Sequence, residues 1–157
     1  MADDFDVVFD DDASGEAADV IGLRKEEANV CLRLVHCKFS SEDLPGARID
    51  DMYQLCGQAQ KCIQWKHRGL RELVNHMKKR EQRWQANGNT RFIKGDMRTA
   101  RALEKQVRFT PLRFEVTIVQ PGLSKEAVTD PILNILGSTD LYLKRTTNAN
   151  LVVLCSR

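Results

Sequence analysis

The sequence predicts a single α/β domain, residues 1–157, built on a central mixed β-sheet that is flanked by helices. Three observations predict this fold class. Three apolar segments joined by short polar links come first, a helical run follows, and strand and helix patterns then alternate. Short links favour antiparallel strands, whereas the later alternation favours parallel pairing in part of the sheet.

The first three strands are expected at residues 5–9, 18–23 and 29–39. Asp, Ser and Gly between residues 10 and 15 predict a turn after the first strand, and the polar residues 25–28 predict a hairpin link after the second. The third segment is apolar over most of its length, which is typical of a central strand.

Helices are expected to dominate the rest of the chain. Apolar residues at helical spacing predict a helix over residues 49–65, and a second, very basic helix is expected over 70–84. The later elements are expected in this order: an edge strand at 91–94, a helix at 97–107, a strand at 114–119 ended by Pro121-Gly122, a helix at 131–144 and a last strand at 151–155.

The charge is distributed unevenly along the chain. Residues 1–20 carry eight acidic residues and no Lys or Arg, whereas residues 66–113 carry fourteen Lys and Arg against four acidic residues. An acidic cluster beside a basic helical segment, residues 66–110, is typical of a protein that holds a metal ion and also neutralises phosphates.

Several classes of protein do not fit the composition. No apolar run approaches the ~20 residues of a membrane span, and the acidic start has no signal-peptide pattern, so we expect a cytoplasmic protein with no membrane partner. The five cysteines form no CxxC pair and no zinc-site spacing, which favours reduced, buried thiols. The sequence has no GxxxxGK[ST] loop, so it is not expected to hydrolyse ATP by itself.

Two carboxylates and a lysine fall where adjacent strands are expected to meet. Glu16 and Asp19 lie at the start of the second strand, and Lys38 ends the third. Carboxylates can hold Mg²⁺ or Mn²⁺ beside a phosphate, and the carbonyl of Cys37 can supply a further oxygen ligand. The ammonium group can orient the attacking water or stabilise the developing negative charge. This pattern predicts a metal-dependent nuclease.

The segment Gly15-Glu16-Ala-Ala-Asp19-Val-Ile, followed one strand later by His36-Cys37-Lys38, resembles the PD-(D/E)xK, or restriction-endonuclease-like, nuclease superfamily. In that family an acidic residue on one strand is followed on the next strand by an acid-x-Lys motif. His36 stands where the family has Asp or Glu. Three roles remain open for it: a neutral metal ligand, a hydrogen-bond partner of the phosphate, or a lost carboxylate.

The resemblance implies a restriction-endonuclease-like fold and hydrolysis of DNA at these residues. The family often carries Gln or Lys on the following helix, and here Gln54, Gln58 and Lys61 share one helix face. Gln58 is therefore expected in the catalytic site, with Lys61 near it. Residues 114–124 and 151–156 also look like the tail of large bacterial helicase–nuclease proteins from phage-defence loci. This second likeness implies a helicase motor elsewhere in a parent protein and a role in antiviral defence.

The expected partner is DNA, bound through its phosphates and therefore with little sequence specificity. The basic side chains expected to bind the DNA backbone are Lys61, Lys78, Lys79, Arg80, Arg83, Arg98 and Arg101.

Two alternative functions stay open. The segment from His36 to Asp43 fits HxKxxxxD, the signature of the phospholipase D superfamily, in which the histidine attacks phosphorus without a metal. A single such motif would need a homodimer to complete its site, and no Gly-Ser-x-Asn follows it here. In the second alternative the fold has lost its activity at His36 and serves as a DNA-binding module.

Overall fold

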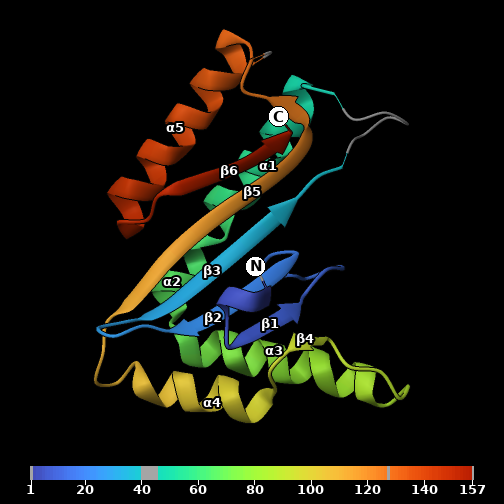
Figure 1. Ribbon diagram of the computed structural model, residues 1–157, viewed down its shortest axis with the longest axis vertical. Coiled ribbons are helices and arrows are strands. Elements are labelled where there is room, and N and C mark those ends of the chain that lie inside the picture. Colours follow the sequence, from blue (N-terminus) through green and yellow to red (C-terminus); the bar gives the residue numbers. More distant parts are fainter. Residues whose placement is uncertain (1, 40–45, 127, 157) are drawn as a thin grey trace.

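The computed structural model describes residues 2–39, 46–126 and 128–156. Six strands of the described residues form one mixed sheet, in the order β4-β1-β2-β3-β5-β6 (Figure 1). Their bounds are β1 Val7–Asp10, β2 Val20–Lys25, β3 Val30–Cys37, β4 Phe92–Lys94, β5 Leu112–Ser124 and β6 Leu151–Ser156. The predicted α/β class with a mixed sheet is confirmed.

Strand directions follow the lengths of the connections. Strand β2 pairs antiparallel with both β1 and β3, and β4 pairs antiparallel with the other side of β1. The strands β3, β5 and β6 pair in parallel, each parallel connection being made through helices. Both predictions about strand direction are therefore confirmed.

Strand β5 is longer than the sequence predicts. Pro121-Gly122 was expected to end the strand, but it continues to Ser124 with an irregular register against β6 between Gln120 and Ser124. The side-chain oxygen of Gln120 accepts a hydrogen bond from the Gly122 amide at 3.2 Å. Proline is tolerated at such an irregularity because the local ladder does not need its missing N–H.

The helices are α1 Ile49–Lys61, α2 Ile63–Arg68, α3 Leu70–Gln85, α4 Met97–Gln106 and α5 Asp130–Thr147, and a short 3₁₀ turn, η1, spans Ala2–Asp4. The helix expected over residues 49–65 is divided at Cys62, and Gly69, with φ of +83°, separates α2 from α3. None of the described helices has the length and apolarity that crossing a lipid bilayer requires.

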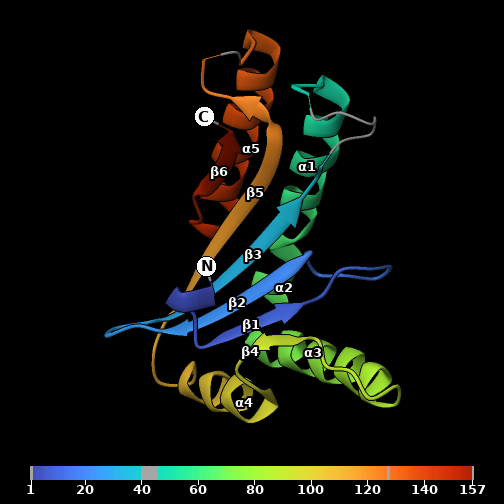
Figure 2. The same cartoon turned by 45° about the vertical axis from the view of Figure 1, so that its right-hand side comes forward.

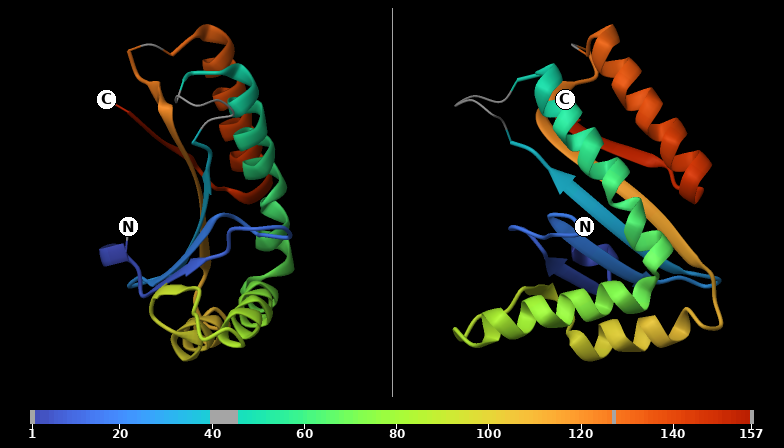
Figure 3. Two further views of the ribbon diagram at one scale, coloured as in Figure 1. Left: turned by 90° about the vertical axis from the view of Figure 1, so that its right-hand side faces the viewer. Right: turned by 180° about the vertical axis from the view of Figure 1, so that it is seen from behind.

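The helices gather on one side of the sheet. Figure 3 (left) shows α1 and α5 along one face and the N-terminus on the opposite side, while α3 and α4 lie beneath the β1–β4 end (Figure 2). Fully buried side chains of the sheet, such as Phe9 and Leu32, form one core with Met52 of α1 and Met77 of α3. Burial of each large apolar side chain contributes about 1.5–3 kcal/mol, so this face fixes the packing of the helices.

Candidate metal and nucleic-acid site

Three carboxylates converge where the chain passes from β1 to β2. Ligand atoms of Asp12, Glu16 and Asp19 all lie within 4.8 Å of one another. Glu16 and Asp19 were predicted from the sequence. Asp12 was not singled out within the acidic turn, residues 10–19. Three consecutive aspartates occupy residues 10–12, and only the folded turn shows which of them faces the other two carboxylates.

Asp19 ties the start of β2 to the end of β3. The two strands pair so that Val20 lies opposite Val35, and the amide of Cys37 donates to the Asp19 carboxylate at 2.7 Å. Burial, the largest effect, raises the pKa of Asp19, and the charge of Asp12 raises it further, while the Cys37 amide opposes both. The carboxylate is therefore held in place by the backbone while its negative charge is poorly compensated.

Glu16 completes this cluster from the far side of the turn. Its carboxylate accepts a hydrogen bond from the Ala13 amide at 3.1 Å. Burial raises the pKa of Glu16, with further increases from Asp19 and Asp12, and the Ala13 amide lowers it in part. A bound cation would remove the repulsion that raises the pKa values of Glu16 and Asp19.

His36 is buried and lines a cavity with Glu16, but its ring nitrogens are not part of the carboxylate cluster. The side chain is 2% exposed, and neither ring nitrogen has a hydrogen-bond partner among the described residues. Burial lowers the pKa of His36 from 6.5 to about 4, so the ring is neutral near pH 7. A neutral imidazole with a free nitrogen is the form that can bind a metal ion.

A small cavity of about 90 Å³ connects His36 with three other residues that the sequence predicted for the site. Glu16, His36, Gln58 and Lys61 all line it, together with Ala17, Cys62 and Gln64. Gln58 and Lys61 lie in the last turns of α1, which packs against β3 and β5. Strand ends and a helix face thus bring residues 16, 36, 58 and 61 to one place.

The residues after His36 extend the edge of this site. Cys37 is exposed, and strand alternation directs its side chain to the other face of the sheet from His36. The amide of Lys38 donates to the Val119 carbonyl at 3.0 Å, so the pairing of β3 with β5 continues one residue past the strand. Lys38 itself is half-buried just past the end of β3, and it is not among the residues that line the cavity.

The basic residues predicted to bind DNA divide into two groups. Lys61, Lys78, Lys79, Arg83 and Arg98 are exposed, and Arg101 is half-buried. Arg80 is 8% exposed, and its guanidinium donates to backbone carbonyls of the acidic turn. The predicted contact of Arg80 with DNA does not fit this placement, because the groups that would bind phosphate are already used inside the protein.

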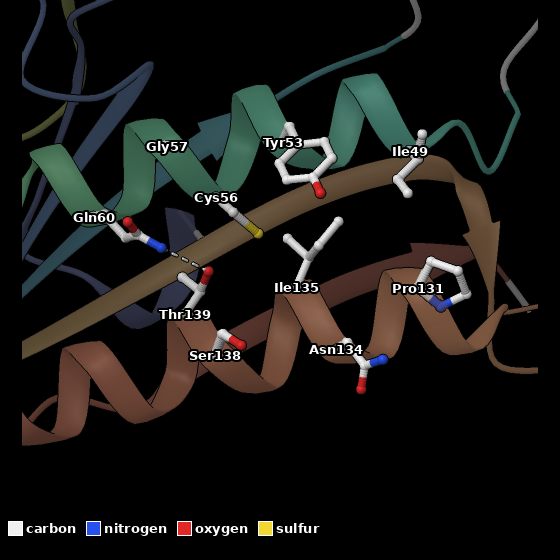
Figure 4. Close-up of a pocket in the computed structure, with 10 residues that line it drawn as sticks. All are labelled: Ile49, Tyr53, Cys56, Gly57, Gln60, Pro131, Asn134, Ile135, Ser138 and Thr139. Carbon is white, nitrogen blue, oxygen red and sulfur yellow. Dashed lines mark hydrogen bonds between the residues drawn. The ribbon is translucent and has the colours of Figure 1, made fainter.

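A larger groove of about 610 Å³ lies between α1 and α5 (Figure 4), and none of the three carboxylates lines it. It is lined by side chains such as Tyr53, Ile135 and Pro131, and the Gln60 amide closes one end by donating to Thr139 at 3.0 Å. None of the residues that the sequence predicted for the site lines it.

Asp43, the last residue of the HxKxxxxD motif, lies outside the described residues. Comparisons of the chain with protein-family models, curated proteins and solved structures found no match. The site is therefore interpreted from its own residues.

Proposed function

We propose that the protein is a metal-dependent nuclease that hydrolyses DNA phosphodiester bonds. One observation carries the proposal: Glu16 belongs both to the carboxylate cluster and to the cavity that contains His36, Gln58 and Lys61. Carboxylates, a neutral imidazole, an amide and an ammonium group thus meet at one edge of the sheet. A surface network of ion pairs would not need a buried histidine without partners.

The donor set fits a divalent cation such as Mg²⁺ or Mn²⁺. Asp12, Glu16 and Asp19 would hold the ion through oxygen, and His36 offers a nitrogen ligand that suits Mn²⁺ better than Mg²⁺. When bound, such an ion lowers the pKa of a water molecule and neutralises charge on a phosphate.

The remaining residues have roles that follow from their chemistry. The Cys37 amide fixes the Asp19 carboxylate, so this oxygen donor does not need to be reoriented. Lys38, which directly follows the end of β3, would stabilise negative charge that develops on the phosphate. Gln58 donates a hydrogen bond to a phosphate oxygen, and Lys61 attracts the neighbouring phosphate.

The exposed basic residues of α3 and α4 would bind the DNA backbone. Lys78, Lys79, Arg83 and Arg98 are available for this, with Arg101 partly engaged by the Asn75 side chain at 2.8 Å. Contacts of this kind give affinity without sequence specificity. A partner motor domain and a role in antiviral defence remain part of the proposal through the sequence resemblance.

The test is cleavage of plasmid and single-stranded DNA with Mg²⁺, Mn²⁺ or EDTA. Asp19→Asn and Lys38→Met should each lower the rate at least about a hundredfold, because each removes charge stabilisation that the reaction needs. Asp3→Asn and Lys25→Met change exposed residues of the same charges and should leave the rate unchanged.

The same experiment separates the alternatives. Cutting that survives EDTA and is lost in His36→Ala would replace the proposal with a histidine nucleophile, although His36 is 2% exposed and would have to reach phosphorus. Absence of cutting, with DNA binding that EDTA does not change, would leave a DNA-binding module.

A further inference from the structure

Asp11 is the buried neighbour of the carboxylate cluster and points away from it, into the protein. Its side chain is fully buried and accepts a hydrogen bond from the Ala17 amide at 2.7 Å. Two residues of α3 reach it from below: Arg80 forms an ion pair at 2.5 Å, and His76 Nε2 lies at 2.9 Å. Asp11 thus connects the beginning of the acidic turn and the Ala17 amide to α3.

Arg80 also holds the backbone of that turn. Its terminal nitrogens donate to the carbonyls of Asp11 at 2.7 Å, Asp12 at 2.9 Å and Ser14 at 3.1 Å. Arg91, from the segment before β4, donates to the carbonyls of Asp10 and Asp12, both at 3.0 Å. The guanidinium of Arg80 therefore binds carbonyls along the turn, and that of Arg91 binds carbonyls at its beginning.

The turn needs such support for two physical reasons. Three carboxylates within 4.8 Å of one another repel when ionised. In addition, Ala13 has φ of +116°, a backbone conformation that costs a non-glycine residue about 1–3 kcal/mol and persists only where its surroundings impose it. A buried guanidinium that binds several carbonyls of the turn, in addition to the hydrogen bonds within it, offsets part of these costs.

We propose that Arg80 is a positioning residue for the cation site: by pairing with Asp11 and binding the carbonyls of residues 11, 12 and 14, it sets the turn in which Asp12 and Glu16 face Asp19. This inference rests on the proposed function, since it assigns a role toward the cation. The cluster has independent support as a ligand site, because the buried His36 lines the cavity next to Glu16 with both ring nitrogens unpartnered.

The experiment measures Mn²⁺ binding by electron paramagnetic resonance and calorimetry, with no DNA present. Arg80→Met removes the clamp, and Arg80→Lys keeps the charge opposite Asp11 but loses the planar fork that binds several carbonyls at once. Arg71→Met, an exposed position on the same helix, is the matched control. Circular dichroism and thermal unfolding establish that each variant is folded.

Both Arg80 variants should weaken Mn²⁺ binding about 10- to 100-fold while Arg71→Met binds as the unchanged protein does, because residues that orient metal ligands have effects of that size. If Arg80→Met does not fold, Arg80→Lys decides. A folded Arg80→Lys protein with a lower melting temperature but an unchanged Kd for Mn²⁺ would overturn the positioning role and leave the proposed function standing. Failure of the unchanged protein to bind Mn²⁺ would overturn the proposed function, and the positioning role with it.

Discussion

His36 shows how one side chain can combine a stability cost with a potential ligand. A buried imidazole without hydrogen bonds loses its hydration and gains nothing in return, which destabilises the fold. The cost is smaller for the neutral ring than for the charged ring, and this difference lowers the pKa to about 4. Binding of a ligand to a ring nitrogen of His36 would offset this stability cost.

The pKa of His36 predicts a specific loss of stability in acid. Because the folded pKa of about 4 is below the ordinary value of 6.5, the contribution of His36 is present above pH 6.5 and lost as the pH falls through about 4. Relative to His36→Leu, the unchanged protein should lose up to about 3 kcal/mol between pH 7 and pH 4. Urea unfolding at several pH values measures this, with the exposed His67→Leu as control. Parallel pH profiles for the unchanged protein and His36→Leu would contradict it.

The pKa of Asp19 predicts the opposite dependence of stability on pH. Its pKa is raised by burial and by Asp12, so the folded protein favours the neutral acid, and stability from this group is lost as the pH rises through the folded pKa. Without metal at pH 7, Asp19→Asn should therefore stabilise the protein, by roughly 0.5 kcal/mol because solvent screens this half-buried group. Adding Mn²⁺ should raise the melting temperature of the unchanged protein and not that of the variant. A variant less stable than the unchanged protein without metal would refute this, with Asp3→Asn as control.

At the level of single residues, the sequence predicted part of the candidate site. Glu16 and His36 were predictable because strand ends that follow one another bring their residues together. Asp12 and the buried partners of Asp11 were not, because a turn takes its shape here from Arg80, 69 residues after Asp11. Local residue types mark the turn but do not show which carboxylate faces inward.

Among the elements, the joint between β4 and α4 is unusually close to β1. Gly95 has φ of +73°, and a Cβ atom there would lie 2.4 Å from the Asp6 carbonyl oxygen. Asp96 then caps α4 by accepting from the Thr99 amide at 2.7 Å. A side chain at residue 95 would push this joint away from the start of β1.

Gly95→Ala should accordingly destabilise the protein by about 2–4 kcal/mol, since strain from positive φ and a backbone clash add together. Gly88→Ala is a matched control, because Gly88 also has positive φ, at +75°, but a Cβ there meets nothing within 4 Å. It should cost about 1 kcal/mol. Thermal or urea unfolding compares the two, and equal losses would mean that the clash at residue 95 is relieved by a backbone shift.

Element positions were more predictable than their limits. The periodic apolar pattern located the helices, but the division at Cys62 and the continuation of β5 past Pro121 depend on packing and strand pairing that a local pattern does not contain. Strand β5 continues because β6 is available to pair with it beyond the irregularity.

Across the whole molecule, acidic and basic regions have separate places. The carboxylates lie at the ends of β1 and β2, whereas exposed basic residues such as Lys78, Lys79 and Arg98 lie on α3 and α4, beneath the β1–β4 side of the sheet (Figure 1). A polyanion bound to these helices would lie near the carboxylates. Because its charge would be partly neutralised by the basic side chains, its repulsion from the carboxylates would be reduced.

DNA binding should therefore depend steeply on salt. The logarithm of the binding constant should fall by about 0.9 per phosphate contact for each unit in the logarithm of salt concentration. Lys78→Ala and Lys79→Ala should each reduce this slope by roughly one contact and weaken binding of all sequences alike. Fluorescence anisotropy at several salt concentrations provides the measurement, with Lys25→Ala as control. Unchanged slopes in both variants would place the DNA elsewhere on the molecule.

Arg80 and Arg91 follow the acidic turn by many residues, and this separation affects when the turn can fold during synthesis. The carboxylates leave the ribosome early, but Arg91 follows Asp10 by 81 residues, so the turn cannot take its final shape until β4 has emerged. Under the proposed function, the nascent protein would carry the carboxylates long before they are brought together, and cation binding would wait until most of the domain has been made. Nascent chains arrested before and after Arg91 emerges should differ in Mn²⁺ binding.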